Sequence, residues 1–447
     1  MSRENQMMEI LGMNALLGYL KATIPKLKDH RKPSPNKKYS IFDAVFSAFG
    51  IFFLQCESFL EYQRQLNSRK GRDNTQTLFG VVKTPTDAQI RNILDKINPN
   101  VLFEVFTVVY QQLKSTGLLK QHEVLGGQLL IPLDGTEYFS SKCIHCEQCS
   151  QRKHKNGTVT YFHTAILPVI VSPNKDSIIS LDPEFITPQD GHKKQDCETA
   201  AAKRWIQRHA NIFTPGKMTL LGDDLYSRQP MCEVSTQQGF HYIFVCLPQS
   251  HKTFYEWLNY LAANGSVNSF QERHRHGRDW HLYNYRWVNR IPLRDAQPAL
   301  ETNWFELIIT RQSDAQILFQ NNWITDHWIN FENLVELASA GRARWKTENE
   351  NHNILKTKGY NLEHNFGHGN EYLASFLITL NLLAFLFHNV LHLIDVNYQQ
   401  VRQQVGTRKR FFHDLRTLTT YFVFDSWQHL ISFMLNEFEP IKTPNSS

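Results

Sequence analysis

Apolar positions follow a helical period at both ends of the chain and a strand-like period in the middle. In residues 1–125 they recur every three or four positions, as in MMEILGMNALLGYLKA and SIFDAVFSAFGIFFLQ, which predicts helices. From about residue 126 the apolar runs are short and rich in β-branched and aromatic residues, as in GGQLLIPLD and TVTYFHTAILPVIV, which predicts strands. Helical spacing returns near residue 335 and continues towards the C-terminus.

These changes of period predict an α/β fold with several regions, since 447 residues are too many for one compact core. Short aromatic stretches such as DWHLYNYRWV and NWFELIIT predict that the segment before residue 335 is mostly β. We expect an N-terminal helical region (1–125), a mixed sheet flanked by helices in two parts (126–226 and 335–395), a β-rich insertion between these parts (227–334) and a C-terminal helical region (396–447).

The most apolar stretch, FLITLNLLAFLFHNVLHLI at 376–394, has the length of a membrane span but contains Asn381, His388, Asn389 and His392. Such polar groups are costly in a bilayer, so we expect a buried helix and no membrane partner. The N-terminus lacks a signal-peptide core, and seven cysteines do not form a disulfide framework. A cytoplasmic protein is therefore expected. Its formal net charge of +6 is compatible with a polyanionic partner.

Several acids occur where strand ends and a helix would bring them together. LLIPLDG places Asp134 at the end of one strand, and MTLLGDD places Asp223 and Asp224 at the end of another. A single Asp there is usually a turn residue or a helix cap, but carboxylates at one edge of a sheet repel each other unless a cation lies between them. Oxygen ligands favour Mg²⁺ or Mn²⁺. The helix at RARWKTENEN offers Glu348 or Glu350 as a third acid.

The residues around these acids resemble the DDE transposases of bacterial insertion sequences, in the group with an RNase H-like core and a Tyr-Arg-Glu-Lys signature. In that group the first Asp often begins Asp-Gly-Thr, as Asp134 does in LDGTEYF. The second Asp is followed closely by an aromatic residue, as Asp223 is by Tyr226 in GDDLYS. The third acid follows an Arg by four positions, which matches Arg344 and Glu348.

Two positions of the signature differ in this sequence. Gly341 stands where the family has Tyr, and Leu355 stands where it has Lys, with Lys356 one position late. Glu350 therefore remains an alternative to Glu348 as the third acid. Asp224 remains second to Asp223.

The resemblance implies a DNA transposase in which Asp134, Asp223 and Glu348 hold two Mg²⁺ or Mn²⁺ ions. The expected reaction is cleavage at the transposon ends and strand transfer into target DNA, both in-line phosphoryl displacements. The expected partner is DNA, bound by a homodimer in the bacterial cytoplasm. The alternatives are a metal-dependent nuclease without strand transfer and a non-catalytic DNA-binding protein derived from a transposase. The residues expected to contact DNA are Arg344, Lys356 and Tyr226.

A second constellation lies in KCIHCEQCSQRKHKNGTVTYFH, where cysteines 143, 146 and 149 recur every third residue near three histidines. Cys-x-x-Cys with a nearby His is zinc-ligand spacing, although it fits no standard finger completely. The alternative is a loop of reduced thiols whose basic neighbours contact DNA. The ligands expected for a structural zinc are Cys146, Cys149, His154 and Cys197.

Three basic segments are candidates for phosphate contact, although each alone is more often a solvated face. They are Lys26 to Lys38, Arg64 to Arg72, and the stretch around Arg273, Arg275 and Arg278. Five candidate tryptophans also lie in the insertion, although tryptophans in strands are mostly core residues. In related transposases this insertion supplies an aromatic residue that stacks on a flipped base. The five tryptophans are Trp280, Trp287, Trp304, Trp323 and Trp328.

Overall fold

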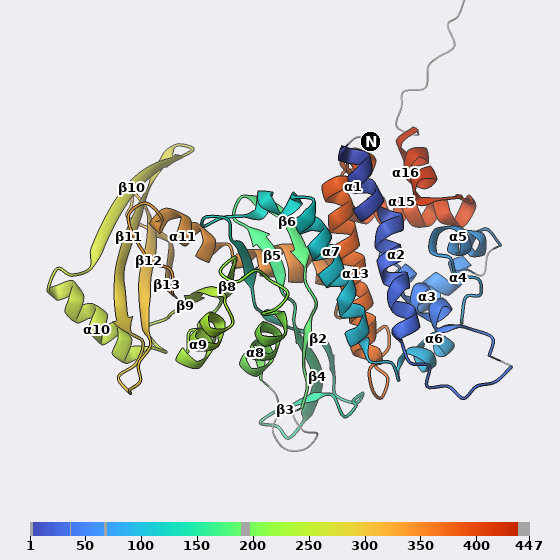
Figure 1. Ribbon diagram of the computed structural model, residues 1–447, viewed down its shortest axis with the longest axis horizontal. Coiled ribbons are helices and arrows are strands. Elements are labelled where there is room, and N and C mark those ends of the chain that lie inside the picture. Colours follow the sequence, from blue (N-terminus) through green and yellow to red (C-terminus); the bar gives the residue numbers. More distant parts are fainter. Residues whose placement is uncertain (1–2, 36, 67–68, 189–196, 437–447) are drawn as a thin grey trace, which may run out of the picture.

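The protein has a mixed α/β structure, as expected. A long mixed sheet extends from one end of the molecule towards the helices at the other (Figure 1). The computed structural model describes residues 3–35, 37–66, 69–188 and 197–436, and within these residues nine strands form the sheet. The strand order is β10-β11-β12-β13-β9-β8-β1-β5-β6. Figure 1 shows the antiparallel strands β10–β13 at one end of the molecule and most of the helices at the other.

The middle of this sheet is built from the short apolar runs of the sequence. β1 pairs antiparallel with β5 and β5 with β6, whereas β1, β8 and β9 are parallel neighbours. All residues of β1, β5 and β8 are buried, which explains why these strands are continuously apolar and do not alternate. The strands are β1 (Leu129–Pro132), β5 (Val169–Ser172), β6 (Lys175–Ser180), β8 (Met218–Gly222) and β9 (His241–Val245).

The β-rich insertion extends the same sheet. β13 pairs antiparallel with β9, and β10 to β13 follow as an antiparallel meander. The expected boundary at residue 227 precedes β9, although β9 pairs in parallel with β8 and so belongs to the middle of the sheet. The strands and helices here are α9 (Gln229–Gln237), α10 (Lys252–Ala263), β10 (Asn268–His276), β11 (Asp279–Pro292), β12 (Glu301–Arg311), β13 (Ile317–Thr325) and α11 (Leu334–Arg342).

A smaller antiparallel sheet lies beside the long one. Its order in the described residues is β2-β4-β3, with β7 also paired to β4. β2 begins at Gly135, so the chain passes from the long sheet into the small sheet at Asp134. α8, whose first residue is Glu198, packs on β7 and β4. The elements are β2 (Gly135–Ser141), β3 (Ser150–Lys153), β4 (Val159–Ile166), β7 (Glu184–Ile186) and α8 (Glu198–His209).

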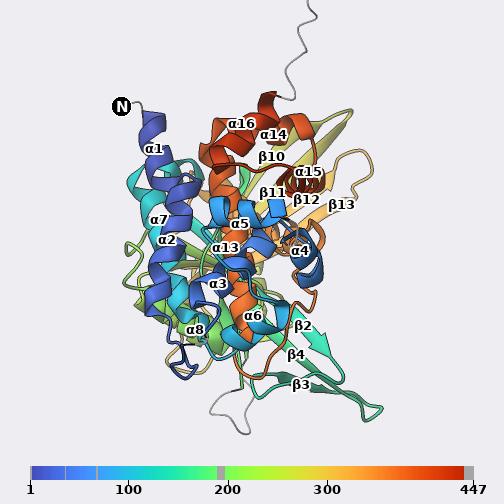
Figure 2. The same cartoon turned by 90° about the vertical axis from the view of Figure 1, so that its right-hand side faces the viewer.

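Helices from both ends of the chain form one helical region around α13 (Figure 2). α13 contains the apolar stretch at 376–394, and among the described helices it alone is long and apolar enough to cross a membrane. In its most apolar window 83% of the residues are buried, so the expected buried helix is confirmed. The helices are α1 (Arg3–Leu11), α2 (Met13–Thr23), α3 (Ile41–Phe53), α4 (Phe59–Leu66), α5 (Arg69–Phe79), α6 (Asp87–Leu94), α7 (Phe103–Ser115), α13 (Leu373–Ile394), α14 (Val396–Val405), α15 (Arg408–Tyr421) and α16 (Trp427–Asn436).

Candidate functional site

Asp134 and Asp223 lie side by side at one edge of the long sheet. β1 and β8 are parallel and in register, with Pro132 opposite Leu221, and each Asp follows two residues after its member of this pair. The ladder continues past the strand ends, because the Leu133 N–H donates to the Leu221 carbonyl at 2.8 Å. The fold therefore brings these two acids together, as the strand pattern predicts.

The structure distinguishes Asp223 from its neighbour Asp224. Oδ1 of Asp224 accepts hydrogen bonds from the backbone N–H of Leu247 at 2.7 Å and from the hydroxyl of Ser250 at 2.6 Å. These contacts turn Asp224 away to hold the loop after β9. Asp223 instead faces the other acids, and its charge raises the pKa of Asp134.

Glu348 reaches the same place from η4 (Thr347–His352), a π-helical turn that follows α11. π-helical turns are rare, and they occur often at functional sites. Nη2 of Arg344 donates to Oε1 of Glu348 at 3.0 Å, as the four-residue spacing predicts. Glu348 is among the charges that act most strongly on Asp134, and Glu350 is not. The geometry therefore favours Glu348 over Glu350 as the third acid.

Glu198, the first residue of α8, adds a carboxylate that the sequence analysis did not include. Its Oε1 accepts hydrogen bonds from the hydroxyl of Tyr226 at 2.7 Å and from the N–H of Gly135 at 3.2 Å. Its charge raises the pKa of Asp134, and the charge of Asp223 contributes to a raised pKa of Glu198 itself, which burial causes chiefly. The sequence signal was weak, since an acid in the first turn of a helix is ordinary.

Tyr226 is fully buried, so the expectation that it contacts DNA is wrong. It lies under the acids, where it donates its hydroxyl proton to Glu198. Gly222 provides the space: a Cβ atom there would lie 2.7 Å from the Tyr226 ring. The aromatic residue after the second Asp is therefore a buried side chain that holds Glu198 in place by a hydrogen bond.

The acids destabilise one another electrostatically. The pKa of Asp134 is raised to about 7, first by burial and then by the charges of Glu198, Glu348 and Asp223, which Arg344 only partly offsets. Nδ1 of His352 lies 3.4 Å from Oδ2 of Asp134. Burial, together with nearby cationic side chains, lowers the pKa of His352 to about 4, so this ring is neutral near pH 7 and adds no positive charge.

A divalent cation fits this arrangement chemically. The donors are all carboxylate oxygens, which Mg²⁺ and Mn²⁺ prefer, and a cation would offset the repulsion that raises the pKa of Asp134. The ligand oxygens are spread more widely than a single ion requires: among the described residues, no three of these acids have ligand atoms that all lie within 4.8 Å of one another.

The two differences from the family signature have structural explanations. At Gly341 a Cβ atom would lie 2.9 Å from the ring of Trp323, so α11 packs too closely on the sheet for a Tyr. Leu355 is fully buried in α12 (Asn353–Thr357), so a Lys at this position would have to bury its charge. Lys356 pairs with Glu363 at 2.8 Å and acts electrostatically on His352.

The cysteines and histidines also converge, but in a different set from the one expected. Cys146 and Cys149 lie in the loop between β2 and β3, and their sulfur atoms meet the Nε2 atoms of His163 and His368. His163 is on β4, and His368 precedes α13. The cluster is Cys146, Cys149, His163 and His368.

His154 and Cys197 lie outside this cluster, so the expectation that they are ligands is wrong. Nε2 of His154 is 2.8 Å from the Thr160 hydroxyl, at the turn between β3 and β4. Cys197 is exposed at the N-terminal end of α8. His163 was part of the sequence motif, but His368 could not be paired with it from spacing because more than 200 residues separate them.

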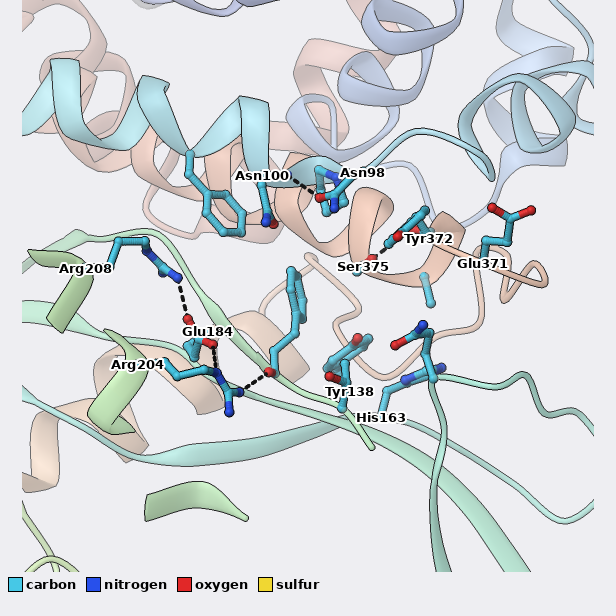
Figure 3. Close-up of a pocket in the computed structure, with 16 residues that line it drawn as sticks. Asn98, Asn100, Tyr138, His163, Glu184, Arg204, Arg208, Glu371, Tyr372 and Ser375 are labelled. Carbon is cyan, nitrogen blue, oxygen red and sulfur yellow. Dashed lines mark hydrogen bonds and ion pairs between the residues drawn. The ribbon is translucent and has the colours of Figure 1, made fainter. Parts of the chain in front are cut away.

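A pocket of about 260 Å³ lies between the small sheet and the helical region (Figure 3). Three of its charged side chains pair with one another: Glu184 accepts from Nε of Arg204 at 2.8 Å and from Nη1 of Arg208 at 2.5 Å. Figure 3 shows Tyr138 beside His163 at the other end of the pocket. The pocket therefore lacks the convergence of several carboxylates that marks the acid cluster.

Comparisons with known proteins assign no family to the chain. No family model matches the sequence, and no curated protein matches it significantly. The function is therefore inferred from the acids at the ends of β1 and β8 and from η4.

Proposed function

We propose that the protein is a DDE-type DNA transposase that cleaves DNA at transposon ends and transfers the freed 3′ end into target DNA. The observation that carries this proposal is the set of mutually repelling carboxylates at the ends of two adjacent parallel strands. Asp134, Asp223 and Glu348 come from three separate segments, and the pKa of Asp134 is raised to about 7 by burial and by its neighbours. A protein that only binds DNA has no use for such a cluster, because it repels phosphate.

In this proposal Asp134, Asp223 and Glu348 hold Mg²⁺ or Mn²⁺. When bound, such ions would favour attack on the phosphorus and stabilise the charge on the leaving oxygen. Arg344, which pairs with Glu348, is placed to bind a phosphate oxygen next to the acids. Glu198 acts as a positioning residue, because it links Gly135 after the first acid to Tyr226 after the second.

The topology is consistent with the RNase H-like core that the resemblance implies. Strands β6, β5 and β1 are antiparallel, and β8 and β9 are added in parallel on the other side of β1. The first two acids follow the central strand β1 and its parallel neighbour β8. The β-rich segment between the second and third acids is inserted in the chain before η4 returns to the site.

DNA contact is proposed for the β10–β11 hairpin. Arg273, Arg275 and Arg278 are exposed at its tip, and the Arg273 guanidinium lies 3.9 Å from the centre of the Trp280 ring. Of the five candidate tryptophans, Trp280 and Trp328 are exposed, and the other three are buried. An exposed aromatic ring beside cationic side chains suits a base and its phosphate. A homodimer on DNA, holding two ends together, belongs to the same proposal.

The test is a Mg²⁺-dependent cleavage assay on DNA from either side of the coding gene, with Asp134→Asn and Asp223→Asn as variants. We expect cleavage by the wild type and none by either variant, with DNA binding retained. Joining of the cleaved end to a second DNA molecule separates transposition from simple nuclease activity. DNA binding without Mg²⁺- or Mn²⁺-dependent cleavage would identify a non-catalytic protein and contradict the proposal.

A further inference from the structure

We propose that Cys146, Cys149, His163 and His368 form a structural zinc site that fastens the small sheet to the segment leading into α13. This site is separate from the acid cluster and does not depend on the proposed reaction. Three of the four side chains are buried, and Cys146 is partly exposed, which gives an ion access from solvent.

Five of the six distances between the four ligand atoms lie close to the edges of a zinc tetrahedron. Zn–S bonds of about 2.3 Å and Zn–N bonds of about 2.0–2.1 Å require S–S, S–N and N–N edges of about 3.8, 3.5 and 3.3 Å. The two sulfur atoms are 3.8 Å apart, and the two Nε2 atoms are 3.1 Å apart. The S–N distances are 3.6 Å for Cys146–His163, 3.4 Å for Cys149–His163 and 3.3 Å for Cys149–His368.

Neither a disulfide nor ordinary hydrogen bonds explain this convergence. A disulfide requires sulfur atoms about 2.05 Å apart, much closer than the 3.8 Å between Cys146 and Cys149. Nε2 of His163 approaches both sulfur atoms and the Nε2 of His368 at once. A neutral imidazole nitrogen has either one proton or one lone pair in the ring plane, so it cannot satisfy three such neighbours. One cation in the centre satisfies all four groups.

Neighbouring groups hold these side chains in orientations suited to binding a metal ion. Nδ1 of His368 lies 2.8 Å from the Gly369 carbonyl, which fixes the proton on Nδ1 and leaves the Nε2 lone pair directed at the cluster. The backbone N–H of Cys146 points to the sulfur of Cys149 at 3.4 Å. The ring of Tyr138 stacks on His163, and that of Phe139 packs on His368 at 4.3 Å between ring centres. The histidine rings are thus held in orientation by bonding and by packing.

The position of the site shows what it would do. Tyr138 and Phe139 are on β2, which begins directly after Asp134, whereas His368 follows η4 and α12 (Asn353–Thr357). Next to His368, the Asp95 carboxylate accepts from the backbone N–H of Asn370, Glu371 and Leu373 at the start of α13. Four protein ligands leave no position for a substrate, so the role is structural. The metal would link the small sheet after Asp134 to the segment between α12 and α13, and so to the helical region.

Metal analysis tests this inference directly. Protein purified from zinc-containing medium without chelators should contain one equivalent of zinc per chain. Replacing zinc with Co²⁺ should give the visible absorption of a tetrahedral site with two thiolates in the wild type and in variants that keep all four ligands. Cys149→Ser and His368→Ala should lose the metal. The matched controls Cys143→Ser and His154→Ala should keep it, because Cys143 lies in the same β2–β3 loop and His154 at the following β3–β4 turn, both outside the cluster.

Chelation should lower the melting temperature of the wild type, and readdition of zinc should restore it. If Cys149→Ser does not fold, Cys146→His provides a further variant, because it keeps four ligands and should retain zinc. The inference is overturned if the folded wild type contains no zinc or comparable transition metal, or if the Cys143→Ser control loses as much metal as Cys149→Ser. Neither result bears on DNA cleavage, so the two proposals fail independently.

Discussion

At the scale of single residues, Asp134 carries the strongest argument for the proposed cation site. Its pKa is raised to about 7 because it is buried beside Glu198, Glu348 and Asp223. An acid with a pKa above its unfolded value of 3.8 takes up a proton on folding. The cost of ionising it in the folded state is therefore absent below about pH 4, grows as the pH rises and is fully present above about pH 7.

Mg²⁺ should therefore stabilise the protein more strongly at high pH than at low pH. At about pH 8 the carboxylate of Asp134 is already ionised, whereas at about pH 5.5 the ion must first displace a proton. We expect a clear rise of the melting temperature with Mg²⁺ at about pH 8 and little change at about pH 5.5, measured by thermal denaturation. In Asp134→Asn the rise should disappear at both values. An equal rise in that variant would contradict the assignment of Asp134 as a ligand.

The third acid can be tested with a pair of matched variants. Glu348→Gln removes a ligand and should lower the rate of DNA cleavage by roughly 100-fold or more, since metal ligation contributes several kcal/mol to transition-state stabilisation. Glu350→Gln makes the same chemical change two residues away, where the side chain is not among the main charges on Asp134. Cleavage by this variant should stay close to that of the wild type. A larger loss of cleavage in Glu350→Gln than in Glu348→Gln would identify Glu350 as the third acid.

Gly135 explains the glycine of the Asp-Gly-Thr motif. A Cβ atom there would lie 2.5 Å from Oε2 of Glu198, so Gly135→Ala must displace the carboxylate that links the first two acids. We expect a loss of about 1–3 kcal/mol in the free energy of unfolding, together with reduced cleavage. Gly18→Ala in α2 is the control, because nothing lies within 4 Å of its added methyl group. It should gain about 0.5–1 kcal/mol, measured by urea denaturation.

A site residue could be predicted when a local pattern marked it, and was missed when its partners lie far away along the chain. Asp134 and Asp223 were predicted because each ends an apolar run, and the sheet supplies the rest. Glu198 was missed because only the fold brings the start of α8 under β2. His368 was missed for the same reason, since its partners lie on or beside the small sheet, more than 200 residues earlier in the chain. Short-range patterns indicate where a strand ends but not which distant helix packs against that end.

At the scale of elements, the buried strands were predicted well, because each is a short apolar run. Local contacts also fix helix starts: Thr86 caps α6 by accepting from the N–H of Gln89. The π-helical turn η4 was not predictable, because the periodicity around Glu348 is that of an ordinary helix. Its extra residue follows from tertiary contacts: Asn351 donates to the carbonyl of Leu167, and Lys346 to that of Lys175. These bonds fix both ends of the turn to the loops that flank β5.

The β10–β11 hairpin gives a prediction about DNA affinity. Changing Arg273, Arg275 and Arg278 together to Ala should weaken DNA binding and reduce the slope of log affinity against log salt by about three, one for each phosphate contact. These side chains are exposed, so the melting temperature should not change. The matched variant with three Lys residues keeps the charge and should retain most of the salt dependence. Binding by the Ala variant with an unchanged salt slope would place the DNA elsewhere.

The division of the whole molecule into regions was the least predictable feature. The sequence suggests separate helical regions at 1–125 and 396–447, because periodicity shows where helices lie but not which of them pack together. In the structure α5 contacts α15, and Nε1 of Trp427 donates to the carbonyl of Leu78. Chain ends separated by the entire core thus share one hydrophobic interior around α13.

Asn74 tests whether this helical region is one unit. Its Nδ2 donates to the carbonyls of Thr419 and Phe422, and its Oδ1 accepts from the N–H of Phe424. Asn74→Ala removes these three bonds, at a cost of about 1–3 kcal/mol for each backbone group that stays buried and unsatisfied. We expect the free energy of unfolding to fall by at least about 3 kcal/mol in urea denaturation. Loss of the N-terminal and C-terminal helices should occur in one transition.

Thr77→Ala is a milder change at the same contact between α5 and the C-terminal helices, which we call the seam. Thr77 makes one bond across it, from its hydroxyl to the carbonyl of Phe424 at 2.6 Å, so we expect a loss of about 1 kcal/mol. Hydrogen exchange should show α15 and α16 losing protection together with α5 in Asn74→Ala, because the seam joins them. If α15 and α16 lost protection while α5 kept it, the C-terminal helices would be a separate unit, as the sequence pattern alone suggests.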